Sequence, residues 1–575
     1  MFNYRVMTIE VTKKLVDVAA GRVEPDLVIT GEVFSVFTGE CFEADVAICS
    51  GYIAGIGEYS APEVYEAEII LPGFIDAHVH IESTLLHPAE FAKAILKHGT
   101  TAVISDPHEI ANVCGKYGVK FMIDSTKNLP VDFYFTAPSC VPAIEGLETF
   151  AFRLESGDIK EILGYERIVG LAEVMNYFGV IEGDMSILSK INLAKEKNKI
   201  IDGHCPGILG NILNAYIVAG ISSDHESTRI DEVMDKLRKG MKIMLREGSV
   251  AKNLKDLAKV VTPYTVSNLM IVSDDLLPDD LLHGHMDERL RRAINYGIKA
   301  EDAVRMVTIN PALHYSLNCG AIAPGYKADL VIVDSFESFK VEMVFKDGNL
   351  VWDGKYHCDF PKVSKMHRIV EKSFKMTEIN VEDLKIKAEG KVCRLIKPVK
   401  DQILTEKGEF EPIIKDNFAY PDTELGVSKV IVIDRHGAGK FIGKAFVEFK
   451  MNGGAMASSV SHDSHNCICV GIDDRDMIRA INAVKEMGGG LAVSFEGELR
   501  TLPLPIAGLM SNLSFEEVVK RIESMNKLLK KMGVQEEYPF IKISFFTLPV
   551  IPKIRITDYG LVDVEKMSLI DLWID

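Results

Sequence analysis

The chain has 575 residues, too many for a single hydrophobic core, so we expect two or three domains. A hydrophobic fraction of 47% and a charged fraction of 26% are typical of a folded globular protein, and no apolar run approaches the roughly 20 residues of a membrane helix. The formal net charge of −18 argues against nucleic acid and anionic membranes as partners.

The first segment is expected to form a small β-domain preceded by a helix. Residues 7–20 have the pattern of a short amphipathic helix. Alternating runs separated by turn residues then predict four strands, at Asp26–Thr30, Val33–Val36, Cys41–Ile48 and Tyr52–Ile56. The same pattern of short alternating runs separated by turn residues recurs after residue 315. We therefore expect one small β-sandwich domain made from both flanks, residues 1–72 and 315–360.

Strand and helix patterns alternate in the central block, residues 73–314, which is the order that gives a parallel sheet or barrel. The eight predicted strands cover residues 73–78, 100–106, 131–137, 168–174, 199–204, 220–225, 241–246 and 269–274. The helical stretches between them include residues 88–98, 185–197, 230–240 and 287–296. Eight such units indicate a TIM-type (β/α)8 barrel, in which the chemistry lies at the carboxyl ends of the strands.

The first barrel strand ends in His78-Val79-His80, with Asp76 two residues before the pair. Residues two apart on a strand project from the same face, and two neutral imidazoles on one face suit a divalent metal ion. Alone, such a pair is more often two histidines in a polar loop than a pair of ligands, and a single strand-end histidine is more often structural. Further polar residues at predicted strand ends are Asp106, His108, Glu109, Glu173, His204, His225, Arg246, Asp274 and Asp275. Six ligand-type residues in this order favour a metal centre.

The order of these residues resembles the amidohydrolase superfamily: His-x-His first, then a carboxylate after the fourth strand, one histidine after each of the next two strands, and an aspartate after the eighth. The stretches HVHIEST, SDPHEIANV, LAEVMN, DGHCPG, SSDHES and VSDD more closely resemble its adenine deaminase family. SHDSHN (461–466) resembles the extra C-terminal domain of that family. Hydantoinase-like members carry a carbamylated lysine after the fourth strand, where this chain has Glu173.

The resemblance implies a binuclear metal centre that deaminates adenine to hypoxanthine and ammonia by means of a metal-bound hydroxide. The implied ligands of the first ion are His78, His80 and Asp274, and those of the second are His204 and His225, with Glu173 bridging the two. Two divalent ions are expected. Manganese and iron are the first candidates, and zinc is a further possibility. The order of metal affinities alone does not choose between them.

Asp274 is the first candidate for the general base that acts on the bridging water, and Glu173 is its rival as a proton shuttle. Glu109 is the third catalytic candidate, with a helix N-terminal carboxylate as the alternative interpretation. His108, Arg246 and Asp275 are assigned to substrate binding. For Arg246 a salt bridge in the barrel rim is an equal alternative.

Residues 361–575 are expected to form a further α/β domain. Its predicted strands include Val430–Asp434 and Lys444–Lys450, and its predicted helices are Met477–Met487 and Phe515–Met532. Two interpretations remain open for His462, Asp463 and His465. They either hold a metal or cap the active site, or they form a polar turn before the strand at residues 467–471.

The alternative function is another amidohydrolase reaction, such as cyclic-amide hydrolysis or amino-sugar deacetylation. A non-catalytic scaffold is disfavoured because none of the expected ligands is missing. Ten scattered cysteines with no paired framework favour a reducing cytoplasm. We expect adenine as the small-molecule partner, a homodimer as the assembly, and no nucleic acid or membrane partner.

Overall fold

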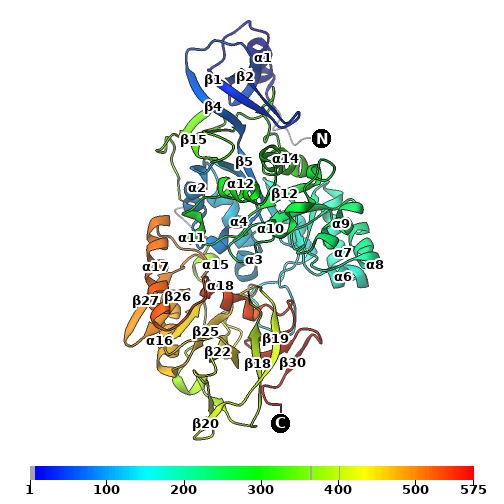
Figure 1. Ribbon diagram of the computed structural model, residues 1–575. Helices are drawn as coiled ribbons and strands as arrows, with labels where there is room; N and C mark the ends of the chain where they lie inside the picture. The colour runs from blue at the N-terminus through cyan, green and yellow to red at the C-terminus, as the bar shows by residue number, and fades with distance from the viewer. Residues whose placement is uncertain (1–6, 363–365, 401, 575) are drawn as a thin grey trace.

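The computed structural model describes residues 7–362, 366–400 and 402–574, so the outermost ends of the predicted first and last domains lie outside it. Figure 1 shows three tiers along the molecule: a small β-domain at the top, a barrel in the middle, and a C-terminal unit coloured yellow to red at the bottom. The (β/α)8 fold class expected from the sequence is confirmed, while the domain boundaries at residues 72, 314 and 360 remain predictions. Within the described residues, no helix is long and apolar enough to cross a bilayer.

The β-domain takes strands from both flanks of the barrel, as predicted. Its seven strands form one ladder, in the order β16 (Asn349–Trp352), β15 (Val341–Lys346), β14 (Leu330–Val333), β4 (Val64–Pro72), β1 (Leu27–Ser35), β2 (Glu40–Cys49) and β3 (Tyr52–Gly57). The flanks join where β14 runs antiparallel to β4, with Leu330 opposite Pro72. Helix α1 (Ile9–Ala19) packs against β2 and β3.

Strand β1 replaces two of the predicted strands, because Gly31 is not a turn. The pairing of β1 with β4 shifts register between Thr30 and Glu32, which is the mark of a β-bulge. A Cβ atom on Gly31 would lie 2.1 Å from the carbonyl oxygen of Ala67. Only glycine permits the neighbouring strand to pass this closely, so the residue that suggested a chain break is a packing requirement inside one strand.

Eight parallel strands form the barrel, at the positions predicted. They are β5 (Phe74–His80), β6 (Thr100–Ser105), β7 (Asp132–Ala137), β8 (Ile168–Val174), β9 (Ile200–Gly203), β10 (Ser223–Asp224), β11 (Lys242–Arg246) and β12 (Leu269–Val272). A two-residue strand directly after β12, β13 (Asp274–Asp275), pairs with the end of β5 and closes one side. On the other side the Ser222 N–H donates to the Ile201 carbonyl at 2.9 Å, which links β9 to β10.

The helices around the barrel follow the predicted stretches, as α2 (Pro88–Leu96), α7 (Met185–Glu196), α9 (Ile230–Arg238) and α12 (Met286–Asn295). In α12 the apolar residues Met286, Leu290 and Ala293 are buried at helical spacing, so one face packs on the barrel. The start of α2 combines proline at the first helical position with His87 as the cap, whose Nδ1 accepts from the Ala89 N–H at 3.0 Å.

The C-terminal unit contains a mainly antiparallel eight-stranded sheet. Its strand order is β19 (Thr405–Phe410), β18 (Cys393–Pro398), β23 (Ile442–Glu448), β22 (Val427–Ile433), β25 (Cys467–Gly471), β24 (Ala455–Ser458), β26 (Gly490–Phe495) and β27 (Glu498–Pro503). The predicted helices are α16 (Asp474–Glu486) and α17 (Phe515–Lys531). The unit is docked on the barrel: the Phe515 N–H donates to Glu90 at 3.0 Å, and Thr149 of the barrel hydrogen-bonds Asp434 and Asn466.

Candidate metal centre and active site

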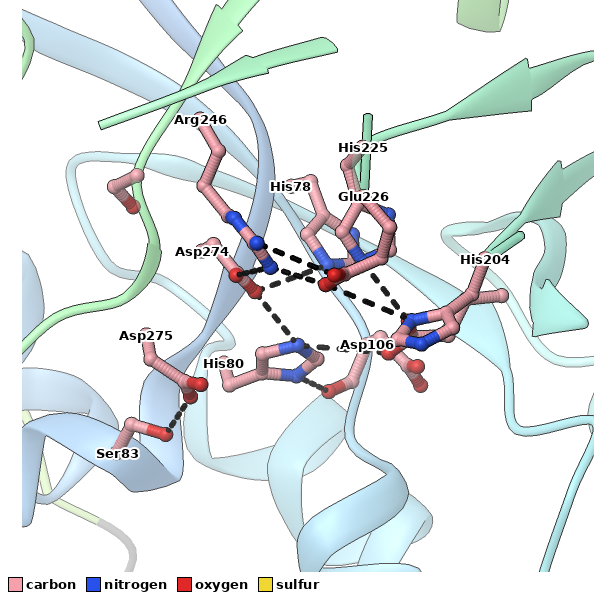
Figure 2. Close-up of polar contacts among 12 residues, drawn as sticks. His78, His80, Ser83, Asp106, His204, His225, Glu226, Arg246, Asp274 and Asp275 are labelled. Carbon is pink, nitrogen blue, oxygen red and sulfur yellow. Dashed lines mark hydrogen bonds and ion pairs between the residues drawn. The ribbon is translucent and has the colours of Figure 1, made fainter. Parts of the chain in front are cut away.

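Residues distant in the sequence meet at the carboxyl ends of the barrel strands. Figure 2 shows the side chains of His78, His80, His204, His225 and Asp274 converging on one another. Both histidines of the His-x-His pair lie on β5, and the ring centroids of His78 and His225 are 4.1 Å apart in a stacked arrangement. The structure therefore brings together the six residues that the sequence suggested as ligands, the sixth being Glu173 on β8.

Glu173 lies between two sets of imidazoles. Its Oε2 is 2.8 Å from His204 Nδ1 and 3.0 Å from His225 Nε2. Its Oε1 is 3.6 Å from His80 Nε2 and 3.5 Å from His108 Nδ1. The two oxygens of one carboxylate thus face different histidines, which is the arrangement that a bridging ligand requires.

Asp274 faces the other end of the cluster. Its Oδ1 is 3.4 Å from His78 Nε2 and 3.3 Å from His80 Nε2. Burial raises the pKa of this carboxyl, but Arg246 and the two imidazoles outweigh burial and hold the pKa well below its usual range. Asp274 therefore carries a negative charge in a buried site.

The hydrogen bonding of His80 indicates that a cation belongs in the cluster. Its Nδ1 lies 3.1 Å from the Asp106 carbonyl oxygen, which can only accept, so Nδ1 carries the hydrogen. In the neutral ring Nε2 is then a bare lone pair facing the carboxylates of Glu173 and Asp274, which are also acceptors. Acceptors converge in this way around a metal ion, and an imidazole whose other nitrogen is held by a carbonyl is a typical metal ligand. The buried residues thus fit a divalent metal site.

His78 gives a second sign of the same kind. Its Nε2 is buried, and it has no hydrogen-bond partner among the residues that the structure describes. A buried polar atom of this kind costs free energy unless a further group satisfies it. The ring nitrogen points into the cluster of carboxylates and imidazoles, where a cation would satisfy it.

Arg246 is held by carboxylates. Its two terminal nitrogens pair with Glu226, and Nη1 also lies 3.0 Å from Asp274 Oδ2. Nε donates to Asn253 Oδ1 at 3.3 Å. Of the two readings that the sequence left open for Arg246, the structure shows the salt bridge. Glu226 was missed as a site residue, although its position directly after His225 at a strand end was a usable signal.

The remaining predicted residues surround the cluster. Asp275 accepts a hydrogen bond from Ser83 at 2.5 Å, and His108 Nδ1 lies 2.9 Å from Asp106 Oδ2. Asp76, two residues before the His-x-His pair, accepts from the Ser273 N–H at 3.2 Å. This hydrogen bond connects β5 to Ser273, the residue directly before Asp274.

Glu109, at the start of α3 (His108–Cys114), faces the C-terminal unit. His462 Nδ1 lies 2.7 Å from Glu109 Oε1, and His465 Nε2 is in close contact with Oε2. Burial raises the pKa of Glu109, but His462 is the largest of the opposing influences that together hold it well below its usual range. Of the two interpretations of the SHDSHN segment, the structure supports the one in which it reaches the catalytic face of the barrel.

A cavity of about 2180 Å³ opens beside the cluster. The barrel contributes His204, Glu226 and Arg246 to its wall, and the C-terminal unit contributes Tyr538 and Phe545. The cavity is far larger than a purine and is lined by both units, so it provides an approach to the strand ends.

Family comparisons agree with this architecture. The amidohydrolase family model matches residues 69–351, and the model of the adenine deaminase C-terminal domain matches residues 402–568. Adenine deaminase 2 of Carboxydothermus hydrogenoformans is 42% identical over 97% of this chain and 99% of its own length. The adenine deaminase of Clostridium acetobutylicum is 43% identical over 96% and 99%, and that of Methanothermobacter thermautotrophicus is 44% identical over 95% and 99%.

The barrel, the split β-domain and the cluster of histidines and carboxylates are those of an amidohydrolase, and the cluster is suited to a divalent metal ion. Within that class, the chain belongs to the adenine deaminase family, which it matches over nearly its whole length.

Proposed function

We propose that this chain hydrolyses adenine to hypoxanthine and ammonia at a centre of two divalent metal ions. The observation that carries the proposal is the position of Glu173, whose two oxygens face different histidines. The full-length similarity to adenine deaminases supports the substrate. Other amidohydrolase reactions are not favoured, because the chain carries an adenine deaminase C-terminal domain as well as the barrel and matches adenine deaminases over nearly its whole length.

In this proposal His78, His80 and Asp274 would hold one ion, while His204 and His225 would hold the other. Glu173 would contact both. Four imidazoles and two carboxylates suit manganese, iron or zinc, and we favour manganese or iron. When bound, such ions supply Lewis acidity that brings the pKa of a water molecule towards neutrality.

The protein must then move two protons. As the water oxygen bonds to C6 of the base, ring nitrogen N1 takes up one proton. The bond between C6 and the exocyclic nitrogen then breaks, and the departing nitrogen takes the second proton to leave as ammonia. Asp274 is ionised and has Oδ2 fixed by Arg246, so its Oδ1 is the acceptor that faces the cluster. We assign it the role of base towards water and donor towards the leaving nitrogen. Glu173 is the second candidate for the same proton.

Glu109 has a different role in the proposal. Both of its oxygens are engaged by histidines of the C-terminal unit, so neither is free to exchange a proton with substrate. We propose that Glu109 orients those histidines. His108 and Asp275 keep their proposed place beside the substrate, whereas Arg246 acts by holding Asp274. The homodimer and the cytoplasmic location remain predictions.

The function is tested by reconstituting the apoprotein with manganese, ferrous iron or zinc and measuring ammonia release from adenine and adenosine, and ring opening of hydantoin. We expect turnover of adenine to exceed that of the other two by at least ~100-fold, the scale of discrimination that buried hydrogen-bonding sites reach. Metal-loaded protein that hydrolyses hydantoin, or that releases no ammonia from adenine, would contradict the proposal.

A further inference from the structure

The loop at residues 461–466 carries four buried side-chain atoms that have no hydrogen-bond partner among the described residues, namely His462 Nε2, Asp463 Oδ2, Ser464 Oγ and His465 Nε2. His465 Nε2 is in close contact with Glu109, and Ser464 interacts with Glu148, which leaves His462 Nε2 and Asp463 Oδ2 unsatisfied. The two side chains are only 4% and 3% exposed. Leaving such groups unpaired costs free energy, so a ligand that pairs with both would be stabilised there.

The rest of this loop is fixed by hydrogen bonds. The Ser461 N–H donates to His465 Nδ1 at 3.1 Å, so in the neutral ring the hydrogen of His465 is on Nε2. That hydrogen faces Glu109 Oε2. Burial lowers the pKa of His465 to about 4, which keeps the ring neutral. Close contact with Glu109 Oε2 thus occupies His465 Nε2, although its geometry is not that of a hydrogen bond.

His462 is held from two sides. Its Nδ1 lies 2.7 Å from Glu109 Oε1, so Nδ1 carries a hydrogen. Its ring stacks on Phe545, with centroids 4.6 Å apart and an interplanar angle of 16°. Burial lowers the pKa of this imidazole, but Glu109 outweighs burial and raises the pKa to about 9. The ring is therefore a cation at neutral pH, and Nε2 is a second, unused N–H donor.

Asp463 supplies the complementary acceptor. Its carboxylate lies in one group with His108 and Glu109, whose ligand atoms are all within 4.8 Å of one another. His108 in turn is 3.5 Å from Glu173, so the pair His462 and Asp463 lies one side chain away from the proposed metal centre. A donor and an acceptor on adjacent residues match a flat heterocycle in which a ring nitrogen and a ring N–H are separated by one carbon atom.

We infer that His462 and Asp463 bind the imidazole edge of the purine, with His462 donating to a ring nitrogen and Asp463 accepting the ring N–H. The inference rests on the proposed function, because adenine has its reacting carbon C6 and its imidazole N–H on opposite rings. With C6 towards Glu173 and Asp274, the far edge extends towards the C-terminal unit. Purines substituted at N9, including nucleosides, lack the N–H that Asp463 accepts, so the substrate class is the free base.

The test is equilibrium binding, measured by calorimetry on the full-length, metal-reconstituted protein. The probes are purine and 9-methylpurine, which differ only at the N–H in question. We expect the wild-type protein to bind purine at least ~100-fold more tightly than 9-methylpurine. In Asp463→Ala the affinity for purine should fall by roughly 10- to 100-fold, while that for 9-methylpurine stays within about threefold.

Two substitutions test the roles of the two ring nitrogens of His462 separately. Glutamine can present an amide N–H where Nε2 was, whereas asparagine reaches only the position of Nδ1 and keeps the contact with Glu109. His462→Gln should therefore retain purine affinity to within about tenfold, and His462→Asn should lose more than that. The reverse order would overturn the role of Nε2.

The control is His436→Gln. His436 supports the same loop through a 2.8 Å contact between its Nε2 and the Ser464 carbonyl oxygen, but it does not contact Glu109. We expect the His436→Gln substitution to change the affinities for purine and 9-methylpurine by the same factor, because His436 supports the loop and does not contact Glu109. A wild-type protein that binds both probes alike, or an Asp463→Ala variant that weakens both equally, would overturn the inference. Failure of the proposed function is a separate result, namely the expected binding pattern without release of ammonia from adenine.

Discussion

The guanidinium of Arg246 lies 3.0 Å from Oδ2 of Asp274, while Oδ1 of the same carboxylate faces His78 and His80. The arginine thus fixes one oxygen and leaves the other towards the imidazoles. Because Arg246 also pairs with Glu226, one buried cation balances two buried carboxylates. The orientation of the proposed base depends on this three-residue network.

Replacing Arg246 by methionine should lower the free energy of unfolding by about 3–5 kcal/mol, because the buried carboxylates of Glu226 and Asp274 would lose the guanidinium that both contact. Adding Glu226→Gln should recover part of that loss, since one of the two charges is then removed. Denaturant unfolding of the single and double variants measures both effects. As a control, Arg229→Met removes an exposed pair with Asp231 and should leave the unfolding curve unchanged. Equal destabilisation in the single and double variants would contradict the network.

Metal content gives a second prediction. Elemental analysis of the reconstituted protein should find two divalent ions per chain, and His225→Ala should retain about one. Chelation should also lower the melting temperature, because the ions bind the folded ligand set preferentially. His357→Ala, which removes an exposed imidazole 2.8 Å from Asp353, should retain both ions. Two ions in the His225→Ala protein would exclude this histidine as a ligand.

Much of the fold could be predicted because its signals are local. Alternation and helical spacing place β5, β8 and α12 within a few residues of where they lie. The errors occur where tertiary contacts override the local pattern. The sequence pattern indicates a turn at Gly31, because the close contact of this residue with Ala67 is not visible in the sequence. The predicted eighth strand is interrupted at Ser273, whose N–H is taken by Asp76, and Asp274 then adopts a positive φ of 57°.

The site was predictable in its ligand types and not in its pairings. The order of histidines and acids along the chain indicates a metal centre, since each residue follows a strand. The sequence does not show that Glu226 pairs with Arg246, because neither residue type is diagnostic alone. The contact between Glu109 and His462 depends on how two units dock, and no periodic pattern encodes docking.

Acid sensitivity should arise partly from His87. Burial and the nearby Lys362 lower the pKa of this imidazole to about 4, and its Nδ1 caps α2 as an acceptor. The unfolded chain takes up the proton near pH 6.5 and the folded chain only near 4. Stability therefore falls as the pH drops through this window, by roughly 1.4 kcal/mol per pH unit.

Asparagine at position 87 can cap the helix without titrating. Between pH 7 and pH 5, wild-type protein should lose about 2 kcal/mol more stability than His87→Asn, as measured by urea unfolding at both pH values. Identical losses in the two proteins would mean that this imidazole does not titrate across the window.

The last prediction concerns Glu173, whose carboxylate replaces the carbamylated lysine of hydantoinase-like amidohydrolases. A carboxylate needs no carbon dioxide to assemble, so activity should be reconstituted from apoprotein and metal in bicarbonate-free buffer. Glu173→Gln keeps the shape of the side chain but removes the charge between the imidazoles of His80, His204 and His225. Turnover of adenine should fall by at least ~100-fold, the scale of a lost acid or base.

Metal analysis of the same variant separates the two roles of Glu173. A protein that keeps two ions but loses turnover indicates that the carboxylate moves a proton, whereas the loss of an ion indicates that it bridges. Glu173→Asp is the matched control, because it retains the charge on a shorter side chain and should retain more activity than glutamine if charge is what matters. Near-normal turnover in Glu173→Gln would exclude both roles and would leave Asp274 as the first candidate for the base.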